Sequence, residues 1–209
     1  MKKVVIILAV IVAVIGAVLY GFYWYLTQGP DLSPYMHLRE PQISAKPAQN
    51  MLVVTAKGDP NVVGGPAFEA LFSTYFRMPG VPKSFGGITP RARWPLSADT
   101  PMSEWVGRYA LPVPDSIDTI PAGDHPAGLS VALEQWSYGE VAEILHFGPY
   151  DQEQPTIERL KGFVRSQGYE ITGEHEEEYL KGPTLFGKGD PQAYVTIIRY
   201  EVAPVDSGR

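Results

Sequence analysis

The sequence has 209 residues, of which 44% are hydrophobic and 19% are charged, so it is long enough and apolar enough to fold around a core. The formal net charge is −6, and no basic run follows Lys2 and Lys3, which argues against a nucleic-acid-binding surface. Cysteine is absent, which excludes disulfides, thiolate metal sites and cysteine nucleophiles.

The N-terminal segment has the composition of a membrane helix. Residues 4–20 (VVIILAVIVAVIGAVLY) carry no charge, and an aromatic run from Phe22 to Tyr25 follows. About 20 apolar residues cross a bilayer core of roughly 30 Å, and aromatic residues favour its interface. A cleaved signal peptide, the alternative, would have a shorter apolar region and small residues at its cleavage site. We therefore expect an uncleaved transmembrane helix over residues 4–26.

The charges beside this segment predict its orientation. Lys2 and Lys3 are the only lysine or arginine residues before Arg39, and the positive-inside rule places the basic end in the cytoplasm. The rest of the chain is then expected on the outer side, periplasmic or extracellular. Residues 27–49 contain several prolines and no clear periodicity, which predicts a linker. The folded domain is expected over residues 50–204.

An internal repeat is visible when the sequence is shifted by 89 residues. MLVVTAK (51–57) then aligns with EVAEILH (140–146), and both are candidate strands. Pro66 aligns with Pro155, each at a candidate helix start, where the missing N–H of proline is harmless. After each helix two more strands are expected: residues 88–96 and 105–113 in the first half, and residues 169–180 and 194–202 in the second.

Each half of the domain is therefore expected to fold as strand, helix, strand, strand. This order predicts an α+β fold in which two pseudo-symmetric βαββ modules form one antiparallel sheet. The helices are expected to cover one face of the sheet. The other face is expected to form a ligand groove between the modules, because ligand sites favour such junctions.

The segment ITGEHEEEYL (171–180) concentrates four glutamates in ten residues. In a strand, alternate side chains point to opposite faces, so three of these glutamates share one face: Glu174, Glu176 and Glu178. Three buried carboxylates would repel one another, so we expect this face to be exposed to solvent. A solvated loop or helix end over the whole segment is the alternative.

Glu177 is expected on the opposite face, between His175 and Tyr179. A lone carboxyl group in a groove can have a raised pKa or bind a cationic ligand. Under the 89-residue shift Ile88 takes its place in the first half, so one acidic site is expected. HEEEY is not a HEXXH zinc motif because position 179 is tyrosine. No metal site is expected, since the histidines show no ligand spacing, although His146 and His175 could meet in space.

Residues 141–202 resemble the GyrI-like family, the gyrase-inhibitor-like effector-binding domains that also occur at the C-terminus of multidrug-sensing transcription activators. The similar stretches are HFGPY (146–150), Gly168-Tyr169, EEYL (177–180) and TIIRY (196–200). The resemblance implies two βαββ modules that form a groove. It also implies that Glu177 is the buried acid that faces ligands.

The resemblance further implies a function, because members of the family bind lipophilic and often cationic compounds. The candidate ligand-binding residues are Glu177, Tyr179, His175, His146, Tyr150 and Trp94. Some members are reported to hydrolyse cyclopropane-containing toxins, and in that alternative Glu177 would be the general base and Tyr179 would position or protonate the substrate. A haem-binding protein, as in the distantly similar SOUL group, and a ligand-free ectodomain are lesser alternatives. No cofactor and no nucleic-acid partner are expected.

Overall fold

The computed structural model describes residues 14–18, 20–21, 29–83, 88–94, 100–123, 125, 128–183 and 189–205. The chain divides into two compact units, Met1–Asp31 and Leu32–Arg209. Most of the expected membrane segment, residues 4–26, lies outside the described residues. No helix in the described part of the chain is long and apolar enough to cross a bilayer. The membrane anchor therefore stays a prediction.

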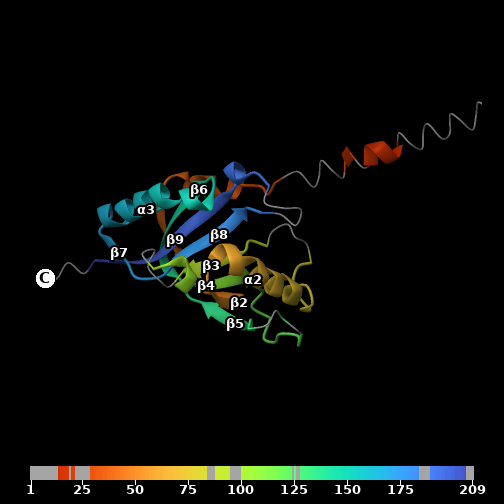
Figure 1. The fold of residues 1–209 in the computed structure, drawn as a ribbon. Helices are drawn as coiled ribbons and strands as arrows, with labels where there is room; N and C mark the ends of the chain where they lie inside the picture. The colour runs from red at the N-terminus through yellow and green to blue at the C-terminus, as the bar shows by residue number, and fades with distance from the viewer. Residues whose placement is uncertain are drawn as a thin grey trace, which may run out of the picture. The chain divides into compact units, whose positions relative to one another are not determined.

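The second unit has an α+β fold built on one antiparallel sheet (Figure 1). Its strands are β1 (Gln42–Lys46), β2 (Gln49–Lys57), β3 (Arg91–Trp94), β4 (Val106–Pro112), β5 (Val131–Trp136), β6 (Gly139–Phe147), β7 (Tyr169–Ile171), β8 (His175–Lys181) and β9 (Val195–Pro204). The α-helices of this unit are α2 (Pro60–Tyr75) and α3 (Gln154–Ser166). Short 3-10 helices are η1 (Ser33–Arg39), η2 (Met102–Glu104), η3 (Tyr150–Gln152) and η4 (Pro191–Ala193).

The order of the strands confirms the two modules. Within the described residues the sheet runs β1-β6-β9-β8-β3-β4-β2-β5, with β7 paired to β9. On either side of the central β3–β8 pair, β4 and β2 follow in one direction and β9 and β6 in the other, as Figure 1 shows. The first module is thus β2-α2-β3-β4, and the second is β6-α3-β8-β9 with β7 added. In the described residues the strand order is symmetric about the central β3–β8 pair.

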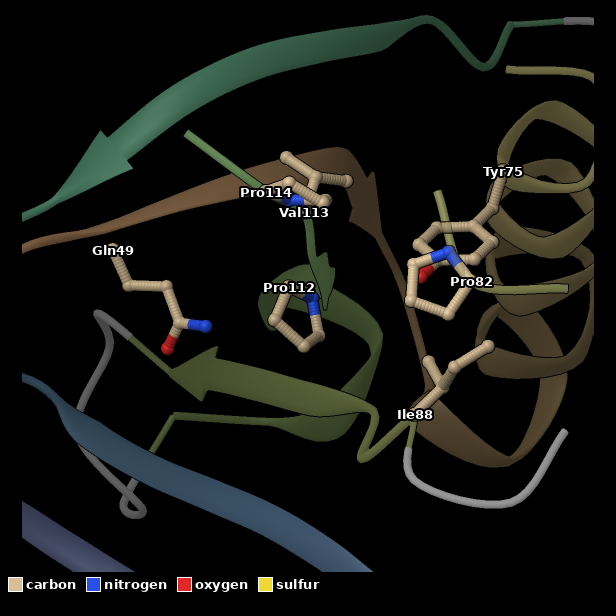
Figure 2. A pocket seen from close by; sticks show the side chains of 7 residues that line it. All are labelled: Gln49, Tyr75, Pro82, Ile88, Pro112, Val113 and Pro114. Atoms are coloured by element: carbon tan, nitrogen blue, oxygen red, sulfur yellow. The ribbon is translucent and has the colours of Figure 1, made fainter. Parts of the chain in front are cut away.

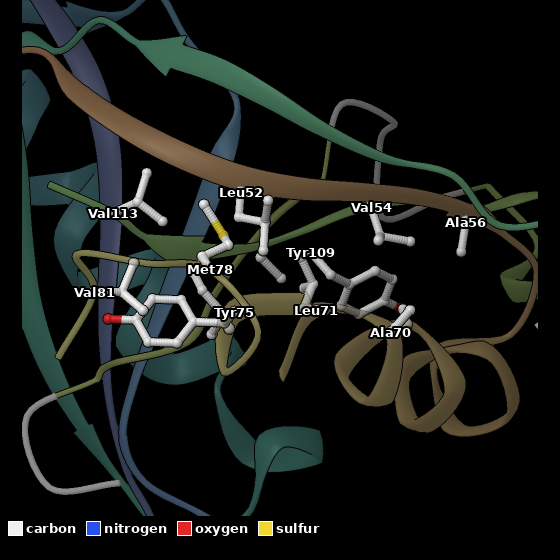
Figure 3. Close-up of a cluster of buried hydrophobic side chains, with 13 residues drawn as sticks. Leu52, Val54, Ala56, Ala70, Leu71, Tyr75, Met78, Val81, Tyr109 and Val113 are labelled. Carbon is white, nitrogen blue, oxygen red and sulfur yellow. The ribbon is translucent and has the colours of Figure 1, made fainter. Parts of the chain in front are cut away.

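Both helices cover the same face of the sheet, as expected. The strand registers place a row of side chains on this face, one from each of six adjacent strands: Val54, Tyr109, Ala92, Glu177, Ile198 and Ile144. Helix α2 packs on the first part of this row through a cluster that includes Leu71 and Tyr75 (Figure 3). Helix α3 packs on the last part through Leu160 and Val164.

Helix α2 begins earlier than the sequence predicted. Asp59 caps it by accepting a hydrogen bond from the Asn61 N–H at 2.9 Å, and Pro60 takes the first position, so Pro66 lies inside the helix. Pro66 cannot donate to the carbonyl group of Val62. Val62 is exposed, so water can replace that bond. The prediction from Pro66 was wrong because an earlier proline with a better cap supplied the start.

The segment predicted as a linker belongs largely to the folded unit. Residues 33–39 form η1, whose Leu38 is buried, and residues 42–46 form β1. Strand β1 pairs with β6, while β5 pairs with β2, so each module receives its outer strand from the segment that precedes the other module. The alternation in QISAK (42–46) is typical of a strand, and Ile43 packs on the α3 cluster. The prolines on either side led instead to the prediction of a linker.

Candidate functional site

Strand β8 carries the acidic segment, and its side chains alternate between the two faces of the sheet as predicted. Glu177 lies opposite Ala92 of β3 and Ile198 of β9, on the face that the helices cover. Glu176 and Glu178 lie on the other face. By register Ala92, not Ile88, is the counterpart of Glu177 in the first module. This counterpart is uncharged, which agrees with a single acidic site.

The face that was predicted to be solvent-exposed is buried. Glu176 is 2% exposed and Glu178 5% exposed. Arg93 donates to Glu176 at 2.6 Å, and Arg199 contacts both glutamates, with Glu178 at 2.8 Å. The prediction was wrong because it considered only the repulsion among glutamates of one strand and not the residues on adjacent strands. Arginines on the two neighbouring strands neutralise the glutamates.

These charges form an ordered row across the sheet. Adjacent strands place Arg93, Glu176, Arg199 and Glu143 opposite one another in turn. A second row pairs Arg91 with Glu178, whose side chains lie 3.2 Å apart. Three arginines thus face three glutamates, and the Tyr138 hydroxyl group, from the β5–β6 connection, links the rows by accepting from Arg91 at 2.7 Å and donating to Glu176 at 3.1 Å. We call this set the charge ladder.

Glu177 has a different environment on the helix-covered face. The Tyr179 hydroxyl group donates to Glu177 Oε2 at 2.7 Å, and His175 Nε2 lies 3.0 Å from Oε1. The Tyr200 hydroxyl group lies 2.7 Å from His175 Nδ1 and holds the ring in this orientation. Burial alone would raise the pKa of Glu177, but the hydrogen bond and charge of His175, followed by Tyr179, outweigh it and lower the pKa.

Glu153, which the sequence analysis missed, is the second acid of this site. It precedes α3, is 4% exposed and forms no side-chain capping bond. Burial, and then the negative charge of Glu177, raise the pKa of Glu153 to about 9. Its Oε1 has no hydrogen-bond partner. An acid directly before a helix start is usually a cap, so the local sequence gave no sign of this role.

Aromatic side chains surround the two acids. Tyr150 and Tyr179 meet at a ring distance of 5.4 Å, and Phe68 of α2 lies 6.1 Å from Tyr179. On the other side, Trp94 contacts Tyr109 with ring centres 5.7 Å apart. The Trp94 indole N–H is buried and helps to lower the pKa of Glu177, although its geometry falls short of a hydrogen bond. The Tyr109 hydroxyl group is also buried without a partner.

Of the predicted site residues, the structure gathers Glu177, Tyr179, His175, Tyr150 and Trp94, but it does not bring His146 into the group. His146 lies on β6, two strands from β8. Its Nδ1 lies 3.0 Å from Thr156 Oγ1 and its Nε2 lies 3.1 Å from the Pro149 carbonyl oxygen, so both ring nitrogens are engaged. His146 therefore holds the turn that carries Tyr150 and Glu153, and it does not meet His175.

The prediction of a groove on the face opposite the helices was also wrong, because the charge ladder fills that side. The candidate site lies on the helix-covered face, with Phe68 of α2 on one side and Glu153, at the start of α3, on the other. A separate pocket of ≈ 450 Å³ lies near the C-terminal end of α2 (Figure 2). Its lining residues are Gln49, Tyr75, Pro82, Ile88, Pro112, Val113 and Pro114, with no acid or base among them. The candidate site is therefore taken to be the cluster around Glu177.

Comparison with known proteins supports the fold. No protein-family model matches the chain, and no curated protein matches it. Among solved structures, it is similar to an uncharacterized conserved protein from Listeria innocua (TM-score 0.65, 21% identity, 83% of this chain and 97% of that chain). It is also similar to a hydrolase from the same organism (0.63, 18%, 84% and 100%) and to the EcmrR C-terminal domain (0.55, 14%, 79% and 98%). At these identities the comparison shows a shared fold and does not assign a function to this chain.

Proposed function

We propose that the chain is a small-molecule-binding protein whose site at Glu177 takes an apolar or cationic ligand. The observation that carries the proposal is a charge imbalance. In the described part of the chain, the ion pairs of Glu176 and Glu178 are with arginine, whereas no lysine or arginine pairs with Glu177 or Glu153. Among the described residues, His175 is the only basic group in ion-pair contact with either acid.

A cationic ligand would complete this site electrostatically. A buried carboxylate without a cation is costly, and a ligand charge placed beside it removes that cost. The aromatic rings of Tyr150, Tyr179 and Trp94 supply faces for an organic cation, and each desolvated cation–π contact contributes about 2 kcal/mol. The Glu177 side chain is 13% exposed, so a ligand reaches it after small movements of these rings.

The experiment that tests the proposal is a titration of the full chain, purified in detergent, with a fluorescent lipophilic cation such as rhodamine 6G. Glu177→Gln keeps the shape and removes the charge, so anisotropy should show at least a tenfold loss of affinity. Glu174→Gln is the matched control, because Glu174 lies on the same segment but pairs with Arg108 at the edge of the ladder. Equal loss in both variants would show that the segment acts only as a diffuse acidic surface.

A hydrolase is the second candidate, and one observation favours it. Glu177 has a lowered pKa and the neighbouring Glu153 a raised one, and acids with opposite shifts are the arrangement in which one group serves as base and the other as acid. In this reading Glu177 activates water, and Tyr179 or Glu153 protonates the leaving atom. Incubation with cyclopropane-containing compounds, followed by mass spectrometry, tests it: addition of water that persists in Glu177→Gln would exclude this mechanism.

The N-terminal segment adds a location to the proposal. We propose that residues 4–26 anchor the chain in a membrane with the folded unit on the outer side, on the basis of the uncharged run and the basic residues Lys2 and Lys3. Protease added to intact spheroplasts should digest the folded unit. Full protection under conditions that digest a known outer-side protein would show that the orientation is wrong.

A further inference from the structure

We propose that Glu153, His175 and Glu177 form a binding site for one transition-metal dication of the zinc type. This inference goes beyond the proposed function, since it assigns to the site a ligand that binds by coordination and not by charge and stacking alone. It shares Glu177 with the proposed organic-cation site, so the two ligands should exclude each other.

The positions of the donor atoms support a metal site. One carboxylate oxygen of Glu153, one oxygen of Glu177 and a ring nitrogen of His175 all lie within 4.8 Å of one another. Tetrahedral zinc, with bonds of about 2.0–2.2 Å, needs its ligand atoms roughly 3.4 Å apart. His175 Nε2 and Glu177 Oε1 are already 3.0 Å apart. A rotamer adjustment of Glu153 is enough to close the triangle.

Each ligand on β8 is held by a tyrosine through its other polar atom. The Tyr200 hydroxyl group lies 2.7 Å from His175 Nδ1, which leaves Nε2 directed at the centre. The Tyr179 hydroxyl group donates to Glu177 Oε2 at 2.7 Å, which leaves Oε1 available. Hydrogen bonds of this kind orient metal ligands and fix the histidine tautomer. The two tyrosines thus supply the supporting contacts that a metal site requires.

Two buried polar atoms at the site have no partner. Glu153 is 4% exposed and its Oε1 makes no hydrogen bond, and Tyr109 is 2% exposed with an unpaired hydroxyl group. Glu177 acts electrostatically on Tyr109, which places this hydroxyl group near the acids. Buried polar atoms are nearly always satisfied in folded proteins. A dication would engage Glu153 Oε1 directly, and a water on the metal would reach a neighbouring hydroxyl group.

The donor set selects the class of metal. One imidazole nitrogen and two carboxylate oxygens suit zinc and similar first-row dications, whereas magnesium and calcium prefer all-oxygen sites with six or more ligands. Both glutamates would be ionised as ligands and would match the double charge, because no lysine or arginine in the described residues pairs with either. Three protein ligands leave a fourth position open for water or a ligand atom, as in catalytic zinc sites.

The test uses the full chain in detergent after treatment with EDTA, titrated with ZnCl₂ by calorimetry and with CoCl₂ by visible absorption. We expect one equivalent to bind, with the intense cobalt bands of a four-coordinate site. Glu153→Gln and His175→Gln should each weaken binding at least tenfold, and Tyr200→Phe should weaken it about 10- to 100-fold by releasing His175. Circular dichroism verifies that each variant is folded. If Glu153→Gln and His175→Gln do not fold, Tyr200→Phe still tests the site.

The controls are Glu158→Gln, one turn into α3 and exposed, and His37→Gln on η1, which should bind as the wild type does. No binding of zinc, or binding that these controls lose as much as Glu153→Gln does, would overturn the inference. The rhodamine titration separates it from the proposed function: zinc binding without dye binding supports the metal site alone, dye binding without zinc binding overturns it, and displacement of dye by zinc supports both.

Discussion

The two faces of β8 treat their glutamates in opposite ways. On one face, Glu176 and Glu178 are buried in the charge ladder, where three arginines match three glutamates. On the other face, Glu177 and its neighbour Glu153 share a largely buried aromatic setting, and in the described part of the chain His175 is the only base in ion-pair contact with them. Neighbouring glutamates on β8 therefore differ in their charged partners, and the residues on adjacent strands determine that difference.

Charge balance within the fold separates acids that stabilise the structure from acids that a ligand could contact. A buried carboxylate whose charge is balanced within the fold is already satisfied, so it has no need of a ligand. A buried carboxylate without a cation raises the energy of the empty protein, and binding of a cation recovers that energy.

Removing the centre of the charge ladder should have the largest effect. Arg199→Ala leaves Glu143, Glu176 and Glu178 buried with an excess negative charge, and loss of one partner from a buried network costs about 3–5 kcal/mol of unfolding free energy. Urea denaturation followed by circular dichroism measures this. Arg159→Ala is the control, because its pair with Glu40 is on the surface and contributes about 0–1 kcal/mol. Similar losses in both variants would mean that the ladder does not stabilise the fold.

The adjacent glutamates should separate stability from binding. Glu176→Gln leaves Arg93 and Arg199 short of a buried partner and should cost about 2–4 kcal/mol of unfolding free energy. Glu177→Gln should change that free energy by about 1 kcal/mol or less, since the amide can still accept from Tyr179 and no lysine or arginine in the described residues pairs with the lost charge. The affinity for rhodamine 6G should fall in Glu177→Gln and should change little in the folded fraction of Glu176→Gln. The division between the two faces fails if Glu177→Gln is the more destabilised variant.

The aromatic side of the site depends on a glycine in β4. A Cβ atom at Gly107 would lie 2.7 Å from the Tyr109 ring and 2.8 Å from the Trp94 ring, so Gly107→Ala must displace one of them. Overpacking of this kind costs about 1–3 kcal/mol of stability, and dye affinity should fall with it. Gly162→Ala on α3, where no atom lies within 4 Å of the added Cβ, is the control. Unchanged dye affinity in Gly107→Ala would place the ligand away from Trp94.

Local patterns in the sequence predicted the modules and part of the site. The repeat gave the strand and helix order, and alternation along residues 171–180 placed Glu177 opposite Glu176. The exposure of each face did not follow, because it depends on which residues adjacent strands present. Arg199 lies far from Glu176 in the sequence, and only the register of β8 against β9 brings them together.

Long-range contacts also explain the residues that the sequence misplaced. Glu153 joins the site because α3 begins beside β8, and a residue before a helix carries no local mark of that. His146 lies in a stretch that resembles the GyrI-like family, but a residue in such a stretch can support a turn as well as contact a ligand. The outer strand β1 was missed because its partner, β6, lies nearly a hundred residues away along the chain. Periodicity reports which residues share one side of an element, but neither whether that side is buried nor what covers it.

The smallest predicted effect is the acid dependence that Glu178 gives to the ladder. Burial alone would raise the pKa of Glu178, but Arg91 and Arg199 outweigh it, so the pKa in the folded state lies below the ordinary value of 4.5. A lowered folded-state pKa contributes stability that is present above the unfolded-state pKa and is lost as the pH falls through the folded-state pKa. The difference in unfolding free energy between wild type and Glu178→Gln should therefore be constant from neutral pH down to about pH 5, and should shrink below about pH 4.5. Glu170→Gln on β7, where the side chain is exposed, should show no such difference at any pH. If the Glu178→Gln difference instead grew on acidification, Glu178 would be held as the neutral acid, and the matching of three arginines to three glutamates would not describe the folded state.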